Sequence, residues 1–181
     1  MLAYKNEEFN YRIYKSDTVI KHQKEMLVEI DEALLLFKDA FPEKDPTWGY
    51  KFYNTFTATA PSFLFYDLFS ELKTIIRDYI GHNNPLWMES WINYHLPNQV
   101  LDWHSHLWPV HGYISIDPKQ TRTVFDGYSI TNELGNIYIG PGYRRHKVEV
   151  LEHFHTPRIT LGFDVVTDPS QSEGILSLIP I

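Results

Sequence analysis

Cysteine is absent from the 181 residues of the chain. Disulfide bonds, thiolate metal sites and a cysteine nucleophile are therefore excluded. Positive charge is also scarce, because 16 lysines and arginines face 23 aspartates and glutamates, which gives a formal net charge of −7. A general nucleic-acid binder needs a basic surface that neutralises phosphates, so we expect no nucleic-acid partner.

Long apolar segments are missing as well. No uninterrupted apolar run approaches the roughly 18 residues that a membrane span needs. The N-terminal segment MLAYKNEEFNYRIYK is polar and aromatic and lacks the apolar core of a signal peptide. We find no internal repeat and no low-complexity tract. The expectation is one soluble domain, located in a reducing cytoplasm, with no membrane partner and with no prediction of oligomeric state.

Aromatic residues, in contrast, are abundant. They make up 15% of the chain, with 5 Trp, 12 Tyr and 11 Phe. Aromatic side chains favour strands and often line ligand pockets. The composition therefore favours a β-rich protein with a ligand site.

Two stretches of the N-terminal half show helical periodicity. Apolar residues recur at three- and four-residue spacing in 16–41 and again in 62–80. Ser16 or Asp17 can cap the first helix, and Gly81 suits the left-handed residue that follows the second. The sequence predicts a helix over each stretch.

Short strands are predicted for most of the remainder. Tyr50–Thr57 is expected to be a strand between the helices, and after Pro85 short aromatic and β-branched runs alternate with turn signals. The expected strands of this second part are Leu86–His95, Val100–His106, Val110–Ile116, Thr121–Ile130, Asn136–Gly140, Lys147–Leu151 and Arg158–Val166.

Consecutive strands without intervening helices indicate an antiparallel sandwich or barrel. The two helices would then cover one outer face of a sheet. We expect a single α+β domain, mainly β, with a helical part in 1–84, a strand core in 85–166, and an arm or late edge strand in 167–181.

Chemistry is concentrated in the run Asp102-Trp-His104-Ser-His106, followed later by His146 and Arg158. Side chains two apart on a strand share a face, so Asp102, His104 and His106 are candidates for one site. Neutral imidazole suits Fe(II), and a carboxylate completes a facial triad that leaves coordination positions open for oxygen chemistry.

The segment from Trp91 to Val166 resembles the Fe(II)/2-oxoglutarate-dependent dioxygenase superfamily. That family carries His-X-Asp/Glu, then a distal His, then an Arg or Lys about ten residues on, often as Arg-X-Ser/Thr. Here His104-Ser-His106 stands in the first position, His146 follows the turn GPGYRR, and Arg158-Ile-Thr160 begins twelve residues after His146.

The resemblance, which covers about 75 of the 181 residues, implies a fold and a site. The fold is a double-stranded β-helix, a jelly roll similar to that of cupins, with both helices packed outside. His104, His146 and either His106 or Asp102 would hold Fe(II). The 2-oxoglutarate co-substrate would be bound by Arg158, Thr160 and Tyr94.

More narrowly, SWINYHLPNQVLDWHSH followed by VHGYISI resembles uncharacterised oxygenases, many encoded by phages and marine bacteria, in which His-X-His replaces His-X-Asp. For a phage-encoded chain the expected location is the host cytoplasm. The site then has three histidines, unless Asp102 supplies the carboxylate.

The implied reaction is oxidative decarboxylation of 2-oxoglutarate to succinate, coupled to hydroxylation of a substrate that the sequence does not identify. Trp103, Trp108, His111 and Tyr113 are candidates to line the substrate site, the alternative being ordinary core. Two other functions stay open. One is a three-histidine iron dioxygenase without 2-oxoglutarate, and the other is a non-catalytic jelly roll, such as a virion or carbohydrate-binding module.

Arg158 lies at the start of an otherwise apolar strand, where a charge is costly to bury without an anionic partner. A bidentate carboxylate of 2-oxoglutarate would be such a partner. The competing partner is Asp164, on the same strand.

Overall fold

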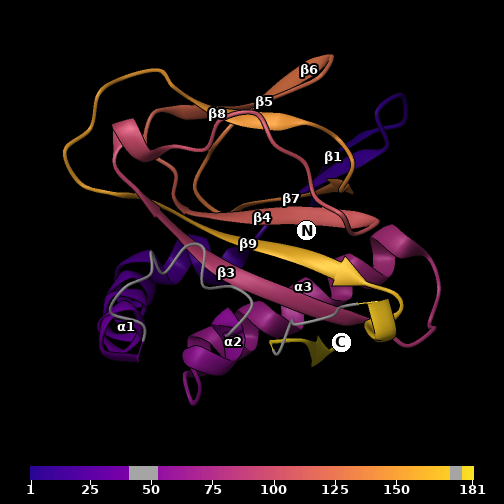
Figure 1. Cartoon of the computed structure of the whole chain (residues 1–181), viewed down its shortest axis with the longest axis horizontal. Helices are drawn as coiled ribbons and strands as arrows, with labels where there is room; N and C mark the ends of the chain where they lie inside the picture. Colours follow the sequence, from indigo (N-terminus) through magenta and orange to yellow (C-terminus); the bar gives the residue numbers. More distant parts are fainter. Residues whose placement is uncertain (41–52, 172–176) are drawn as a thin grey trace.

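The computed structural model describes residues 1–40, 53–171 and 177–181. Its strands form two antiparallel sheets, and three helices accompany them (Figure 1). The helices are α1 (Asp17–Ala40), α2 (Thr55–Ala58) and α3 (Phe63–Ile80). The strands are β1 (Leu2–Asn6), β2 (Tyr11–Lys15), β3 (Trp87–His95), β4 (Val110–Asp117), β5 (Thr121–Phe125), β6 (Tyr128–Thr131), β7 (Asn136–Pro141), β8 (His146–Val150), β9 (Arg158–Val166) and β10 (Ile179–Pro180).

The larger sheet has the order β1-β2-β7-β4-β9-β3-β10, and the smaller sheet has the order β6-β5-β8. β9 is an inner strand of the larger sheet. One of its edges pairs with β3, from Arg158 opposite His95 to Val166 opposite Trp87. Its other edge pairs with β4. This mainly β, antiparallel architecture agrees with a jelly-roll type of fold.

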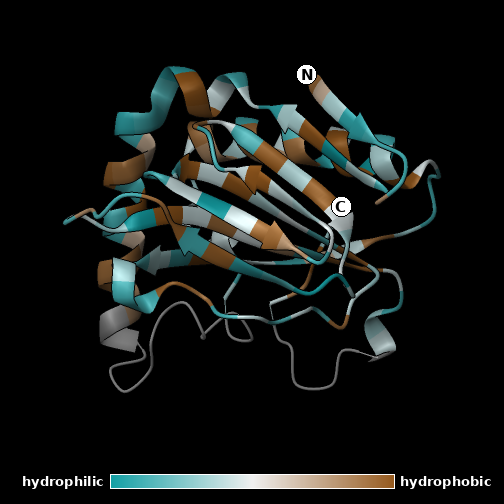
Figure 2. Ribbon diagram, turned by 90° about the horizontal axis from the view of Figure 1, so that it is seen from above, coloured by the Kyte–Doolittle hydropathy of each residue, from teal (hydrophilic) through white to brown (hydrophobic). Residues whose placement is uncertain are grey.

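The helices lie on one side of the larger sheet and the smaller sheet on the other (Figure 1). Strand side chains alternate between these two sides, and Figure 2 shows hydrophobic residues alternating with more polar ones along the strands. The helix side forms the main core, in which α1 and α3 pack on the larger sheet. Its fully buried members include Met26, Ile30, Leu68, Leu72, Ile92, Ile114, Ile137, Leu161, Phe163 and Val165.

The side facing the smaller sheet is different, because it collects buried polar groups. It carries Arg158, Thr160 and Asp164 from β9 at alternate positions, all of them buried. A second cluster of mostly aromatic residues, including Phe125 and Tyr138, also lies there. A one-residue slip of β9 would move these polar groups into the apolar core, so burial fixes the register strongly.

Both predicted helices are present within the described residues. Ser16 accepts a hydrogen bond at its Oγ from the Val19 backbone N–H at 3.1 Å, at the start of α1. Ser62 caps α3 in the same way through Phe65, and Gly81 follows that helix with a φ of 78°. These local signals act as the sequence predicts.

Three strand predictions need correction. Tyr53–Thr57, the described part of the strand expected over 50–57, is not a strand, because the Asn54 side chain caps α2 through the Phe56 backbone N–H. Tyr50, Lys51 and Phe52 lie outside the described residues. The strand expected over 121–130 is two strands, β5 and β6, because the chain turns at Gly127, whose φ is 99°.

The third correction concerns Val100–His106, which is not a strand. Its only strand-like pairing is an isolated bridge between His104 and His146. The hairpin of β1 and β2 was not predicted, although it extends the larger sheet through β7. In the C-terminal segment, β10 pairs with β3 as an edge strand. None of the described helices is long and apolar enough to cross a membrane.

Candidate metal centre

Two loops meet to build the site. The segment between β3 and β4 leaves the larger sheet and runs beside β8 of the smaller one (Figure 1). His104 and His146 exchange both backbone hydrogen bonds, at 2.9 and 2.8 Å, and the His106 N–H donates to the Gly142 carbonyl at 2.9 Å. Backbone pairing therefore fixes the starting points of all three histidine side chains.

His104, His106 and His146 each offer a ring nitrogen, and these nitrogens all lie within 4.8 Å of one another. The Nδ1 of His104 lies 2.7 Å from the Asp102 carbonyl, and the Nδ1 of His146 lies 3.0 Å from the Arg144 carbonyl. A carbonyl oxygen can only accept a hydrogen bond, so each Nδ1 donates. The lone pair of both rings is therefore on Nε2, where a metal ion can bind.

His106 completes the set from the opposite side. Its Nδ1 is 2.8 Å from Oδ2 of Asp164. Its Nε2 is buried and has no hydrogen-bond partner in the described part of the chain. A buried nitrogen without a partner is costly, and a metal ion would satisfy it. The three residues thus fit an ion that accepts neutral imidazole, such as Fe(II) or Zn(II).

The protonation of the histidines suits this role. Burial lowers the pKa of His104. Burial, helped by the neighbouring imidazoles, lowers the pKa of His146 to about 2. Metal binding requires deprotonated ligands, and these two rings are neutral at physiological pH.

Asp102 is not brought to the three histidines. Its side chain is exposed and accepts a hydrogen bond from the Trp103 N–H at 2.7 Å. Asp102 approaches the site through its main chain, since its carbonyl oxygen accepts from His104. The expectation that a strand would place Asp102, His104 and His106 on one face fails because this segment is a loop.

Arg158 occupies the other end of the same polar face. It is 3% exposed, and its Nε and Nη1 each donate a 3.3 Å hydrogen bond, to the hydroxyls of Thr121 and Thr160 respectively. No aspartate or glutamate among the described residues forms an ion pair with it. The proposed partner Asp164 instead bonds His106 and His111, so that alternative was wrong.

Burial lowers the pKa of Arg158 to about 10. The guanidinium still carries its charge at neutral pH. A buried cation without an anionic partner is strongly destabilising, so its retention points to an anionic ligand.

Further polar groups surround Arg158. The Ser115 hydroxyl is buried and forms no hydrogen bond within residues 1–40, 53–171 and 177–181. The Tyr113 hydroxyl is also buried and interacts with the Thr123 side chain. Burial raises the pKa of Tyr113 to about 12, so the hydroxyl keeps its proton and can donate it to an acceptor. Ser115 lies opposite Thr160 across the β4–β9 pair. The neighbourhood of Arg158 therefore contains several buried hydroxyl groups.

Tyr94 does not lie with Arg158, contrary to expectation. Alternate residues of a strand face opposite sides, and Asn93, its neighbour, donates a hydrogen bond to Thr160 on the polar face. Tyr94 is therefore on the helix side of β3, is 37% exposed, and has a pKa that burial and the nearby Asp31 raise.

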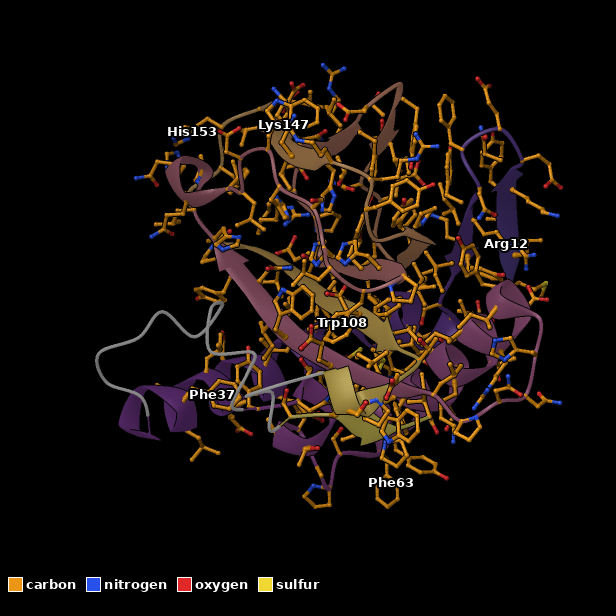
Figure 3. All side chains as sticks on the ribbon, turned by 45° about the vertical axis from the view of Figure 1, so that its right-hand side comes forward. Arg12, Phe37, Phe63, Trp108, Lys147 and His153 are labelled. Carbon is orange, nitrogen blue, oxygen red and sulfur yellow. The ribbon has the colours of Figure 1, made fainter. Side chains whose placement is uncertain are left out.

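The aromatic candidates for a substrate site also separate. Trp103 is 38% exposed and lies beside the cations of Arg145 and Lys147, at 5.6 and 5.4 Å from its ring. Trp108 is part-buried, and its Nε1 donates to Glu89 at 2.9 Å. Figure 3 shows Lys147 on the smaller sheet and Trp108 at the larger one.

His111 was a candidate substrate residue, but it is part of the buried site. Its ring stacks on that of His106 with centroids 3.6 Å apart, and its Nδ1 lies 2.7 Å from Oδ1 of Asp164. Asp164 and His95, which pairs with Arg158 across β3 and β9, were not recognised as site residues. The even spacing of Arg158, Thr160 and Asp164 on one strand was the available signal for Asp164.

Comparison with known proteins gives similarity at the level of structure. No family model and no curated protein matches the chain. Among solved structures, the chain is similar to SnoK, a non-heme alpha ketoglutarate dependent carbocyclase from nogalamycin biosynthesis. The TM-score is 0.60 at 11% identity, over 88% of this chain and 83% of that one.

A second similar structure is SnoN, a non-heme alpha ketoglutarate dependent epimerase from the same biosynthesis. Its TM-score is 0.52 at 11% identity, over 87% of this chain and 78% of that one. At this level of identity the comparison shows the fold alone. The chain shares the fold of these two enzymes.

Proposed function

We propose that the protein is a non-haem Fe(II) oxygenase that uses 2-oxoglutarate as co-substrate, built on a double-stranded β-helix. One observation carries the proposal. Three convergent imidazoles lie near the smaller sheet, and the facing side of the larger sheet carries a buried arginine that has no anionic partner among the described residues. The fold shared with two alpha ketoglutarate dependent enzymes supports it. The narrower likeness to phage and marine bacterial oxygenases and the cytoplasmic location stay predictions.

His104, His106 and His146 would hold the iron through Nε2. Bound Fe(II) supplies the activation of O₂ that couples decarboxylation of 2-oxoglutarate to oxidation of the substrate. The protein contributes orientation. Arg158, steadied by the hydroxyls of Thr121 and Thr160, would bind the far carboxylate of 2-oxoglutarate and so direct its keto-acid end to the metal.

The two ends of this site are separated along β5. Thr121 contacts Arg158, and Phe125 pairs with His146 across β5 and β8. These two β5 residues are four positions apart, or about 13 Å of strand.

A second function is favoured by the ligand set itself. Three neutral ligands leave the iron with a higher net charge than two histidines and a carboxylate would. A three-histidine dioxygenase that oxidises a chelating substrate directly, without 2-oxoglutarate, therefore stays a candidate. It requires the metal but assigns no role to the Arg158 cation.

Calorimetric titration of 2-oxoglutarate into the Co(II)-loaded protein under nitrogen separates these functions. We expect binding that requires the metal and that Arg158→Met weakens by about 2–5 kcal/mol, which is about 30-fold or more. Metal affinity should be unchanged in this variant. Without 2-oxoglutarate, Arg158→Met should melt at a temperature no lower than wild type, because it removes an unpaired buried charge.

Arg122→Met is the matched control, because Arg122 is exposed and pairs with Glu149 on the outer surface. It should leave 2-oxoglutarate binding unchanged. Metal binding without any 2-oxoglutarate binding would favour the three-histidine dioxygenase. Absence of metal binding in the wild-type protein would favour the non-catalytic jelly roll.

A further inference from the structure

Asp164 is a carboxylate whose side chain contacts a histidine of the candidate metal centre. Its two oxygens are divided between two rings: Oδ2 lies 2.8 Å from Nδ1 of His106, and Oδ1 lies 2.7 Å from Nδ1 of His111. Asp164 is 3% exposed and His111 is 5% exposed. The contact is therefore shielded from water, where charge-assisted hydrogen bonds are strong.

Both imidazoles must donate to this carboxylate. An ionised carboxylate only accepts hydrogen bonds, so each Nδ1 carries a proton. In His106 the lone pair is consequently on Nε2, the buried nitrogen that has no protein partner among the described residues.

The orientation of the His106 ring is fixed from two further directions. It stacks on His111 with an interplanar angle of 14° and on Trp91 with an angle of 19°. Stacking sets the plane of the ring, while the Asp164 bond sets its rotation within that plane. Together they leave His106 one way to present Nε2 to the other two histidines.

We propose that Asp164 is a positioning residue of the metal centre, which holds His106 in the orientation that binds a metal through Nε2. Through its hydrogen bond to His106 it also supplies the negative charge that a directly coordinated carboxylate would otherwise supply. The proposal rests on the proposed function, because it requires His106 to bind the metal. It explains why a buried carboxylate on β9 is retained next to two histidines. A carboxylate behind a ligand imidazole raises the basicity of the ligand and fixes its tautomer.

The same residues also admit a competing arrangement. His106, His111 and Asp164 offer donor atoms within 4.8 Å of one another, which would make a site of two histidines and one carboxylate. A metal there would replace both hydrogen bonds to Asp164 and would not need His104 or His146. The test must distinguish this arrangement from a positioning role.

The experiment measures the Co(II) dissociation constant by absorption titration for the wild-type protein, Asp164→Asn and Glu89→Gln. Asparagine keeps one acceptor oxygen but presents an N–H donor to one of the two rings, so it disturbs the tautomers without changing volume. We expect Asp164→Asn to weaken Co(II) binding by about 10- to 100-fold. Glu89→Gln is the matched control, since Glu89 lies opposite Asp164 on β3 and accepts from Trp108, and it should change the affinity less than about threefold.

A second variant, His106→Asp, tests whether Asp164 acts on the metal through the His106 imidazole. In His106→Asp the imidazole is gone, and the ligand itself carries the charge. Adding Asp164→Asn to this variant should not weaken Co(II) binding further. Nitrogen NMR of the metal-free protein labelled at histidine should show His106 protonated at Nδ1 in the wild type and a changed tautomer in Asp164→Asn. A residue with only a structural role would not move that signal.

The possible results distinguish failure of the proposed function from failure of the role proposed for Asp164. If the wild-type protein binds no Co(II), the proposed function fails. If it binds Co(II) and Asp164→Asn binds equally well with an unchanged His106 tautomer, only the role of Asp164 is overturned. If Asp164→Asn abolishes binding while His104→Ala and His146→Ala retain it, the metal belongs to the competing arrangement, and the positioning role is again overturned.

Discussion

His106 stands where the resembled oxygenase family carries a coordinating carboxylate, and the structure shows how an imidazole can take that place. Its backbone N–H is held by Gly142, its Nδ1 by Asp164, and its Nε2 is left for a ligand. Asp102, the other candidate, has an exposed side chain that is bonded within its own loop. At the scale of single residues, the third metal ligand is therefore expected to be His106.

Three substitutions test this assignment. His106→Ala should lower Fe(II) affinity at least about tenfold, a loss no smaller than that for residues behind a ligand. Asp102→Asn should leave most of the affinity, because only the Asp102 carbonyl contacts His104. His106→Asp should retain iron, since it restores two histidines and one carboxylate.

Dissociation constants measured anaerobically for the three proteins decide the matter. The opposite pattern, in which Asp102→Asn loses the metal and His106→Ala keeps it, would make the ligand set Asp102, His104 and His146.

Residue types and spacing were enough to single out His104, His106, His146 and Arg158. They were not enough to place Tyr94, which faces the helices because it is one position out of phase with Asn93 and its bond to Thr160. Asp164 was recognised as a charge near Arg158 but paired with the wrong residue. Its real partners are His111, which the register of β9 against β4 places opposite it, and His106, which lies in a loop.

At the scale of elements, the site depends on the loop Val100–His106, which forms one isolated β-bridge. The segment before β4 meets β8 through the isolated bridge of His104 with His146 and through a hydrogen bond from the Val148 N–H to the Leu101 carbonyl. The aromatic and polar alternation of Val100–His106 therefore resembled a strand, although the segment forms none. The tight contact that holds the two loops together is at Gly142. Its N–H donates to the Pro109 carbonyl at 3.1 Å, and its carbonyl accepts from His106.

Gly142→Ala should therefore weaken metal binding although it replaces none of the three histidines. An added Cβ would lie 2.1 Å from the carbonyl oxygen of Trp108, a backbone atom that can only move together with the loop. We expect Co(II) affinity to fall about tenfold, comparable to the loss of a residue behind a ligand. Ser105→Ala, at an exposed position between two of the ligands, is the control and should bind as wild type. Wild-type affinity in Gly142→Ala would show that the spacing of the two loops does not position the histidines.

At the scale of the whole molecule, the two sides of the larger sheet differ: one forms the apolar core, and the other carries polar residues of the candidate site. One side packs on α1 and α3 and forms the main apolar core, while the other side faces the smaller sheet (Figure 1) and carries Asp164 and Arg158. His146 comes from β8 of the smaller sheet. Strand texture and helical periodicity predicted a mainly β fold with two helices. The β1–β2 hairpin was not predicted, and the pairing of β2 with β7 joins residues more than a hundred positions apart, so its place in the sheet leaves no local signal.

The central claim is that one metal and one 2-oxoglutarate bind together on this inner side of the sheet. Anaerobic titration of the protein with Fe(II) and 2-oxoglutarate, followed by visible absorption, tests it most directly. The account predicts a weak charge-transfer band in the green region that needs both additions, saturates at one equivalent of each, and is absent in His146→Ala and Arg158→Met. Saturable Fe(II) binding with no such band at any 2-oxoglutarate concentration would contradict it.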